Sequence, residues 1–104
     1  MNKALQKLPA LVAEELEAAN AEHAQFHSLH EGYAVMLEEV EECADELKCI
    51  ENALNCMWGN VKHDATVNAR QCTDYLEQHA LYLAAEAIQV AAMARKMKFC
   101  TERR

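Results

Sequence analysis

Apolar residues recur every three or four positions along most of the chain, which is the period of an α-helix rather than of a strand. The pattern predicts a first helix from about Leu5 to His23, followed by a connection through residues 25–29. Pro9 fits this helix only within its opening turn, because proline lacks the N–H that a helix interior requires. The predicted inward stripe consists of Leu8, Leu11, Val12, Leu16 and Ala19.

The second predicted helix begins with a capping signal. Ser28 precedes Glu31 by three residues, the capping-box spacing in which each side chain satisfies a free backbone N–H. Gly32, in the first turn, is equally consistent with the close approach of another segment and with no special role. The helix is expected to end at residues 59–60 or 62–64. Its apolar positions are Tyr33, Met36, Leu37, Val40, Cys43, Ala44, Leu47, Ile50, Leu54, Met57 and Val61.

A third helix follows, with Asp64 or Thr66 as its predicted cap. His79 and Glu86 occupy positions in its otherwise apolar stripe. A second stripe is almost entirely alanine, which permits another helix to approach closely. The first stripe is Ala69, Cys72, Leu76, His79, Leu83, Glu86, Val90, Met93 and Met97, and the alanine face is Ala80, Ala84, Ala87, Ala91 and Ala94.

These elements predict an all-α fold, a bundle of three to four helices in a single domain over residues 1–104. Only two glycines and one proline are present, which leaves little material for turns. The second and third segments both exceed an average helix, so one of them can be broken in two. Long stripes wider than one seam need partners on more than one side. We therefore expect a homodimer or homotetramer, with the alanine face or the methionine-rich face at the interface.

The net charge and the cysteine content argue against several classes of protein. A formal net charge of −7 disfavours binding to a nucleic-acid backbone, and no stretch predicts a secretory signal or a membrane span. The basic residues at positions 95, 96, 98, 103 and 104 are expected to complement the dipole of a helix C-terminus. The five cysteines include no CxxC pair, which predicts reduced thiols that act as small core residues in a cytoplasmic protein.

Acidic residues gather on one side of the second predicted helix. Alone, they are typical of a solvated face. Glu86 changes this picture because it lies in an apolar stripe, where a buried carboxylate must be paired, protonated or metal-bound unless that edge of the stripe is exposed. A cation between Glu86 and the acidic helix would neutralise the carboxylate of Glu86 and those of the helix. Mg²⁺ is a suitable cation because it prefers carboxylate oxygens. The acids on this side are Glu38, Glu39, Glu42, Asp45 and Glu46.

Residues 37–42, Leu-Glu-Glu-Val-Glu-Glu, resemble the E-E-x-x-E helix of the MazG-like, all-α nucleoside triphosphate pyrophosphohydrolases. The segments HEGYAV at 30–35 and EAIQVAAMA at 86–94 are similar to those of small MazG-like proteins, and the resemblance covers roughly residues 26–97. In this superfamily, ExxE on one helix and ExxD on a later helix hold Mg²⁺. The ion bridges the phosphates of a nucleotide and promotes attack by water.

The resemblance implies a nucleotide substrate that is cleaved to the monophosphate and pyrophosphate, with Mg²⁺ or Mn²⁺ as cofactor. Gln89 stands where the family has aspartate, so it offers a neutral amide oxygen instead of a charge. The gap from Glu42 to Glu86 is also longer than is usual in the family. The implied metal ligands are Glu39, Glu42, Glu86 and Gln89, and the base that activates water is one of Glu38, Glu41 and Glu46, with Glu38 assigned as the catalytic candidate.

Two other readings stay open. The first is a non-catalytic helical bundle or interaction protein that keeps the MazG-like fold with a degenerate metal site. The second is a transition-metal site on His27 and His30, since His23, His27 and His30 share helical spacing. That segment crosses the predicted connection, which favours histidines at a helix boundary instead. Tyr33 and Trp58 are expected in the core rather than as platforms for a nucleotide base.

Overall fold

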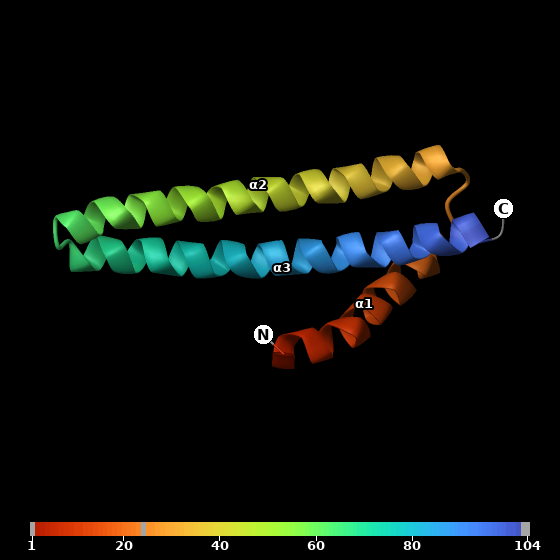
Figure 1. The fold of residues 1–104 in the computed structure, drawn as a ribbon, viewed down its shortest axis with the longest axis horizontal. Coiled ribbons are helices and arrows are strands. Elements are labelled where there is room, and N and C mark those ends of the chain that lie inside the picture. Colours follow the sequence, from red (N-terminus) through yellow and green to blue (C-terminus); the bar gives the residue numbers. More distant parts are fainter. Residues whose placement is uncertain (1, 24, 103–104) are drawn as a thin grey trace. The chain divides into compact units, whose positions relative to one another are not determined.

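The computed structural model describes residues 2–23 and 25–102, and this part of the chain forms α-helices joined by short connections. The helices are α1 (Asn2–Glu22), α2 (Leu29–Lys62) and α3 (Thr66–Glu102) (Figure 1). No strand occurs within the described ranges. The all-α prediction is therefore confirmed, and the second and third predicted segments each form one unbroken helix.

The start of α2 follows the capping signal in the sequence. The backbone N–H of Glu31 donates to Oγ of Ser28 at 3.1 Å, which satisfies one of the free donors of the first turn. At the other end, α2 continues to Lys62, the later of the two predicted ends. Ser28 is thus confirmed as the residue that determines where α2 begins.

The turn between α2 and α3 uses a left-handed residue. Asp64 has a φ of 52°, a conformation that aspartate tolerates better than most residues. The carbonyl of Ala65 accepts the N–H of Ala69 at 2.9 Å, the first helical bond of α3. Ala65 is therefore the N-cap, and the prediction that Asp64 or Thr66 fills this position was wrong.

Pro9 lies inside α1, because this helix begins at Asn2 and not at Leu5. The prediction that Pro9 belongs to an opening turn was therefore wrong. An interior proline costs a helix about 3 kcal/mol. Val12 and Leu16 of α1 are both buried, and burial of two such side chains contributes about 3–6 kcal/mol. Tertiary packing thus outweighs the local cost of the proline.

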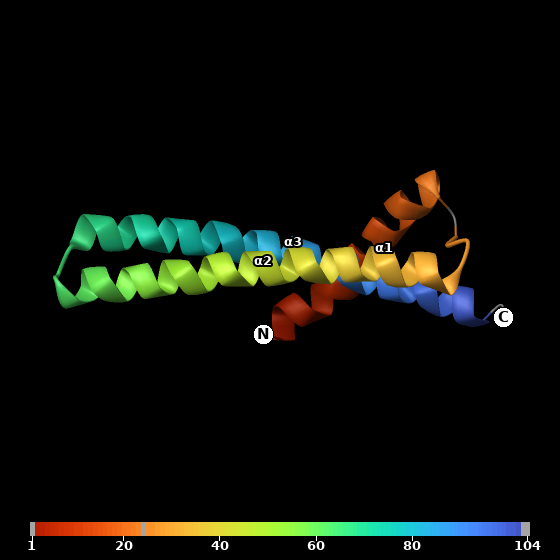
Figure 2. The ribbon, with the colours of Figure 1, turned by 90° about the horizontal axis from the view of Figure 1, so that it is seen from above.

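The chain divides into two compact units, residues 1–41 with 86–104 and residues 42–85. In the first unit, α1 packs against the C-terminal part of α3 (Figures 1 and 2). Val35 and Met36 of α2 pack against the same core. The prediction of one domain over residues 1–104 stays a prediction. The buried core of this unit consists of Val12, Leu16, Phe26, Ala92, Met93 and Cys100.

The second unit is an antiparallel helical hairpin. The C-terminal part of α2 and the N-terminal part of α3 lie side by side in both views (Figures 1 and 2). Ala53 is its buried residue, with 5% of its surface exposed. A small residue at this position allows the two helices to approach closely.

The predicted stripe of α3 faces inward along its whole length, because each of its nine positions is buried or half-buried. The stripe of α2 is divided: Met36, Cys43, Ile50 and Met57 are half-buried, whereas most of the other positions are exposed. Tyr33 and Trp58 are 61% and 60% exposed, so the expectation that they belong to the core was wrong. The apolar stripe of α2 is wider than the surface that one neighbouring helix covers, so the side chains along its other edge stay exposed to solvent.

The cysteines differ in their burial. All five are free thiols, as predicted, but only Cys100 is buried, and Cys56 is exposed. The interpretation of the cysteines as small core residues is therefore correct for Cys100 and wrong for Cys56. The remaining three, Cys43, Cys49 and Cys72, are half-buried and lie in the second unit.

Gly32 is a point of close approach in the first unit. A Cβ atom at this position would overlap Sδ of Met97 and would lie 2.9 Å from Cδ2 of Phe26. The Met97 side chain can shift, but the buried ring of Phe26 has little room to do so. Of the two alternatives left open for Gly32, the structure thus favours close approach.

Replacing Gly32 by alanine is expected to lower the free energy of unfolding by about 1 kcal/mol, because overpacking of about 1–3 kcal/mol exceeds the gain of about 1 kcal/mol in helix propensity. Gly59 is the matched control, since nothing lies within 4 Å of its Cβ position in the same helix. Gly59→Ala is expected to raise stability by about 0.5–1 kcal/mol. Urea unfolding measures both changes, and equal shifts for the two variants would contradict the close approach.

Candidate functional site

Glu39 of α2 and Glu86 of α3 meet within the first unit. Each offers a carboxylate oxygen, and these two oxygens lie within 4.8 Å of one another. The Oε2 atoms of both residues are buried. Oε2 of Glu86 accepts no hydrogen bond from the described residues, and an unsatisfied buried acceptor costs about 1–3 kcal/mol. A divalent cation between the two carboxylates would remove that cost, so these residues fit a metal of the Mg²⁺ class.

The other predicted ligands are placed by the helices that carry them. Glu42 is exposed and lies three residues after Glu39 on α2, a spacing that puts two side chains on the same side of a helix. Gln89 is half-buried and lies one turn after Glu86 on α3. Glu38 is exposed next to Glu39. The structure therefore brings Glu39 and Glu86 together, while the roles of the other three stay predictions.

Glu46 has a partner on α3 that helical spacing alone did not predict. Its Oε2 lies 2.5 Å from Nδ1 of His79 in the second unit, and both side chains are mostly shielded from solvent. Glu46 is one of the three acids considered as the base that activates water, and in the structure it is paired with His79. Glu38 and Glu41 are exposed. The signal in the sequence was His79 itself, a polar residue in an apolar stripe.

Aromatic residues flank His79 on α3. The ring centroids of Tyr75 and His79 are 4.2 Å apart, and those of His79 and Tyr82 are 5.4 Å apart with the rings nearly perpendicular. A hydrogen bond with the Cys49 thiol, followed by the negative charge of that cysteine, raises the pKa of Tyr75. Tyr75 thus stays protonated at neutral pH and connects Cys49 with the imidazole of His79.

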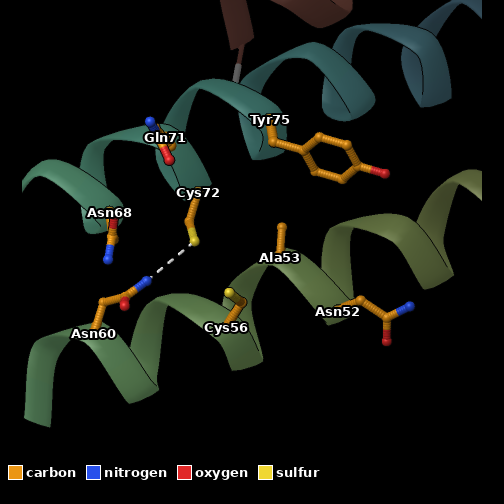
Figure 3. A pocket seen from close by; sticks show the side chains of 8 residues that line it. All are labelled: Asn52, Ala53, Cys56, Asn60, Asn68, Gln71, Cys72 and Tyr75. Atoms are coloured by element: carbon orange, nitrogen blue, oxygen red, sulfur yellow. Dashed lines mark hydrogen bonds between the residues drawn. The ribbon is translucent and has the colours of Figure 1, made fainter.

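A hollow of about 520 Å³ opens beside this aromatic group in the hairpin (Figure 3). Nδ2 of Asn60 donates to Sγ of Cys72 at 3.4 Å. A hydrogen bond with Cys56, and then burial, raises the pKa of the Cys72 thiol. The walls carry amides and thiols but no carboxylate, so the hollow offers hydrogen bonds rather than charge. Its lining consists of Asn52, Ala53, Cys56, Asn60, Asn68, Gln71, Cys72 and Tyr75.

The three N-terminal histidines do not share one helix. His23 and His27 lie in the connection between α1 and α2, whereas His30 lies in α2. All three are exposed, and Nδ1 of His27 lies 3.6 Å from the carboxylate of Glu31. Within the described ranges, no cluster of potential metal ligands includes any of them. The interpretation as histidines at a helix boundary fits this arrangement.

Lys96 has an unexpected environment in the first unit. It is 7% exposed, and its Nζ donates to the backbone carbonyl of His23 at 2.6 Å, just beyond the end of α1. The same ammonium lies 4.7 Å from the centroid of the Phe26 ring. A basic residue near the C-terminus thus complements a helix C-terminus, as predicted, but the helix is α1. Sequence spacing alone offered no signal for this contact.

Comparison with known proteins adds no relative. No protein-family model matches the chain, and no curated protein or solved structure matches it. None of the described helices combines the length and apolar character needed to cross a bilayer. The MazG-like assignment therefore stays a prediction that rests on the motifs and on the geometry of the acids.

Proposed function

We propose that this chain is a Mg²⁺-dependent nucleotide pyrophosphohydrolase, which cleaves a nucleoside triphosphate or related nucleotide to the monophosphate and pyrophosphate. The observation that carries this proposal is the pair of Glu39 and Glu86, whose carboxylates converge while Oε2 of Glu86 lacks a donor among the described residues. When bound, Mg²⁺ supplies positive charge to phosphate oxygens and lowers the pKa of a coordinated water. The proposed ligands are Glu39, Glu42, Glu86 and Gln89.

The residues of the chain have separate tasks in this reaction. Glu39 and Glu86 supply opposing carboxylates from two helices, and Glu42 adds a third from the next turn of α2. Glu38, exposed beside Glu39, accepts the proton of the attacking water. Gln89 contributes an amide oxygen without charge, which weakens cation binding relative to an aspartate. Mn²⁺ is expected to substitute for Mg²⁺, because both accept carboxylate and carbonyl oxygens.

Pyrophosphate release from a panel of ribo- and deoxyribonucleoside triphosphates, with Mg²⁺ or Mn²⁺, tests the activity. Glu39→Ala is expected to lower kcat/KM by at least about 10–100-fold, the loss typical even of groups that only support metal ligands. Glu77→Gln is the control, since Glu77 is an exposed acid on α3. Turnover by the wild-type chain no greater than that of Glu39→Ala would remove the enzyme proposal.

The alternative is a non-catalytic helical bundle with a degenerate metal site, and Gln89 is the residue that favours it. Gln89→Asp separates the two functions, because it restores the charge that the family pattern has at this position. Metal binding without turnover in the wild-type chain, together with turnover in Gln89→Asp, would establish the degenerate site. Turnover in the wild-type chain supports the enzyme.

We infer that the chain forms a homodimer through the exposed edge of α2. Its exposed large apolar residues are three, four or seven positions apart, so they fall on one side of the helix, as in a coiled-coil seam. The solvent-accessible surface is 7800 Å², whereas a typical monomer of 11.7 kDa exposes about 5900 Å². The excess is larger than the roughly 800 Å² that each partner buries in a standard interface. This α2 seam consists of Tyr33, Leu37, Val40, Leu47, Leu54, Trp58 and Val61.

The two faces considered for the interface differ in the structure. Met93 and Met97 belong to the core of the first unit, so the methionine-rich face is used within the chain. The alanine face of α3 is exposed at all five of its positions, and it offers a second contact for a homotetramer. The five free thiols favour the reducing cytoplasm as the location of this assembly.

Leu54→Lys is expected to convert the dimer into a monomer, because Leu54 is 53% exposed within the chain and central to the α2 seam. Removing two buried leucines per dimer costs about 3–6 kcal/mol, or roughly 100-fold or more in Kd. Asn55→Lys is the matched control, with the same charge change at the next exposed position. Light scattering after size exclusion measures the mass. A dimeric Leu54→Lys variant would show that the seam is not the interface.

A further inference from the structure

Glu46, Cys49 and His79 form a cluster of three different metal-binding groups within the helical hairpin of the second unit. One ligand atom from each residue, a carboxylate oxygen, a thiol sulfur and an imidazole nitrogen, lies within 4.8 Å of the other two. All three residues are half-buried. The cluster lies outside the Mg²⁺ site proposed above and uses none of its ligands.

The helices explain why these side chains meet. Glu46 and Cys49 are three residues apart on α2, so they project from the same side of that helix. His79 belongs to the inward stripe of α3, which places its ring opposite them. Nδ1 of His79 and Oε2 of Glu46 are 2.5 Å apart. Both residues lie within helices, so the packing of α2 against α3 brings these two side chains together.

The donor set indicates the class of metal. Thiolate, imidazole and carboxylate are the ligands of Zn²⁺, whereas Mg²⁺ and Ca²⁺ prefer oxygen alone. Three protein ligands leave one position of a tetrahedral ion open, which is the arrangement of catalytic rather than structural zinc sites. We propose that Glu46, Cys49 and His79 bind Zn²⁺ or a chemically similar transition-metal ion.

The surroundings hold the imidazole in place. Tyr75 and Tyr82 contact the His79 ring one turn before and one turn after it on α3. The hydroxyl of Tyr82 in turn accepts a hydrogen bond from Nε2 of Gln78 at 2.7 Å. Restricting the ring and its neighbours reduces the entropy lost when the metal binds.

Binding requires small movements and the release of a proton. Two ligands on a tetrahedral Zn²⁺ ion are roughly 3.3–3.7 Å apart, given bonds of about 2.0–2.3 Å. Glu46 and His79 would therefore separate by about 1 Å from their present 2.5 Å. The proton of the Cys49 thiol is released to solvent when the metal binds.

Tyr75 lies between the metal cluster and the hollow of the hairpin. Its side chain lines the hollow (Figure 3). Its ring also contacts the ring of His79, with the centroids 4.2 Å apart. The phenol is thus a polar group of the chain beside the proposed metal ligands.

Titration of the reduced, metal-free protein with Co²⁺ tests the site directly, because a thiolate on Co²⁺ gives a charge-transfer band in the near ultraviolet that oxygen and nitrogen ligands do not give. The wild-type chain is expected to show this band at about one equivalent per chain, with Zn²⁺ displacing the Co²⁺. Cys49→Ser is expected to lose the band, and Cys56→Ser, an exposed cysteine of the same helix, to retain it. The absence of a band in the wild-type chain, or its persistence in Cys49→Ser, would overturn the proposal.

Two further variants keep the test decisive if Cys49→Ser disturbs the hairpin, which circular dichroism would show. Glu46→Gln and His79→Asn retain the thiol, and each is expected to weaken Co²⁺ binding by at least about 10–100-fold. His63→Asn is the control, since His63 is exposed in the turn after α2. Unchanged affinity in both ligand variants, or an equal loss in His63→Asn, would overturn the proposal. Pyrophosphate release is a separate measurement, so failure of one site is distinguishable from failure of the other.

Discussion

Replacing Lys96 by alanine is expected to lower the free energy of unfolding by about 2–4 kcal/mol. The substitution removes a charge-assisted hydrogen bond to the carbonyl of His23, which contributes about 1.5–3 kcal/mol. It also removes the ammonium from the face of the Phe26 ring, a contact of about 0.5–2 kcal/mol, and leaves space around the buried stem. The better helix propensity of alanine offsets only a few tenths of a kcal/mol.

Lys98→Ala is the matched control, because Lys98 is exposed two residues away on the same helix. Its effect should stay within about 0.5 kcal/mol. Lys96→Met, which keeps the stem but not the donor, separates packing from the hydrogen bond. Urea unfolding measures all three, and an equal midpoint for Lys96→Ala and Lys98→Ala would show that the contact with α1 contributes nothing in solution.

Replacing Glu86 by glutamine is expected to have opposite effects with and without metal. Without metal, the substitution removes one of two like charges whose oxygens lie within 4.8 Å, so stability should rise by up to about 1 kcal/mol. With metal, it removes a charged ligand. A cation that binds only the folded chain stabilises it by about 2.7 kcal/mol at 100 times its Kd, and the variant should lose most of that gain.

Thermal unfolding at increasing Mg²⁺ or Mn²⁺ concentration measures both effects in one experiment. The wild-type Tm should rise with metal concentration, while the Tm of Glu86→Gln should start higher and stay nearly constant. Glu77→Gln, an exposed acid on the same helix, should follow the wild-type chain. A wild-type Tm that stays constant with Mg²⁺ and Mn²⁺, with and without nucleotide, would contradict a cation between Glu39 and Glu86.

Part of the candidate site could be predicted because helical spacing is a local property. Glu39 and Glu42 are related by one turn of α2, and Glu86 was identified by its place in an apolar stripe. The structure shows that Glu86 is indeed shielded and that it meets Glu39. The cluster of Glu46, Cys49 and His79 could not be predicted in the same way. Glu46 and His79 are 33 residues apart, and their contact depends on the register of α2 against α3.

The same distinction explains the errors about burial. Periodicity shows which side of a helix is apolar, but it does not show how much of that side another helix covers. Tyr33 and Trp58 belong to the apolar side of α2 and yet are mostly exposed within the chain. Pro9 shows the converse, because a residue that opposes helix formation locally is tolerated where neighbouring side chains are buried.

The sequence by itself determined the all-α class, the inward stripe of α3 and the start of α2 at Ser28, because backbone hydrogen bonding and side-chain spacing within a helix are local. The tertiary structure alone decided which edge of α2 is covered, that Lys96 meets the end of α1, and that His79 meets Glu46. Those contacts join residues far apart in the chain, and they depend on how the helices pack, which the helical period does not specify.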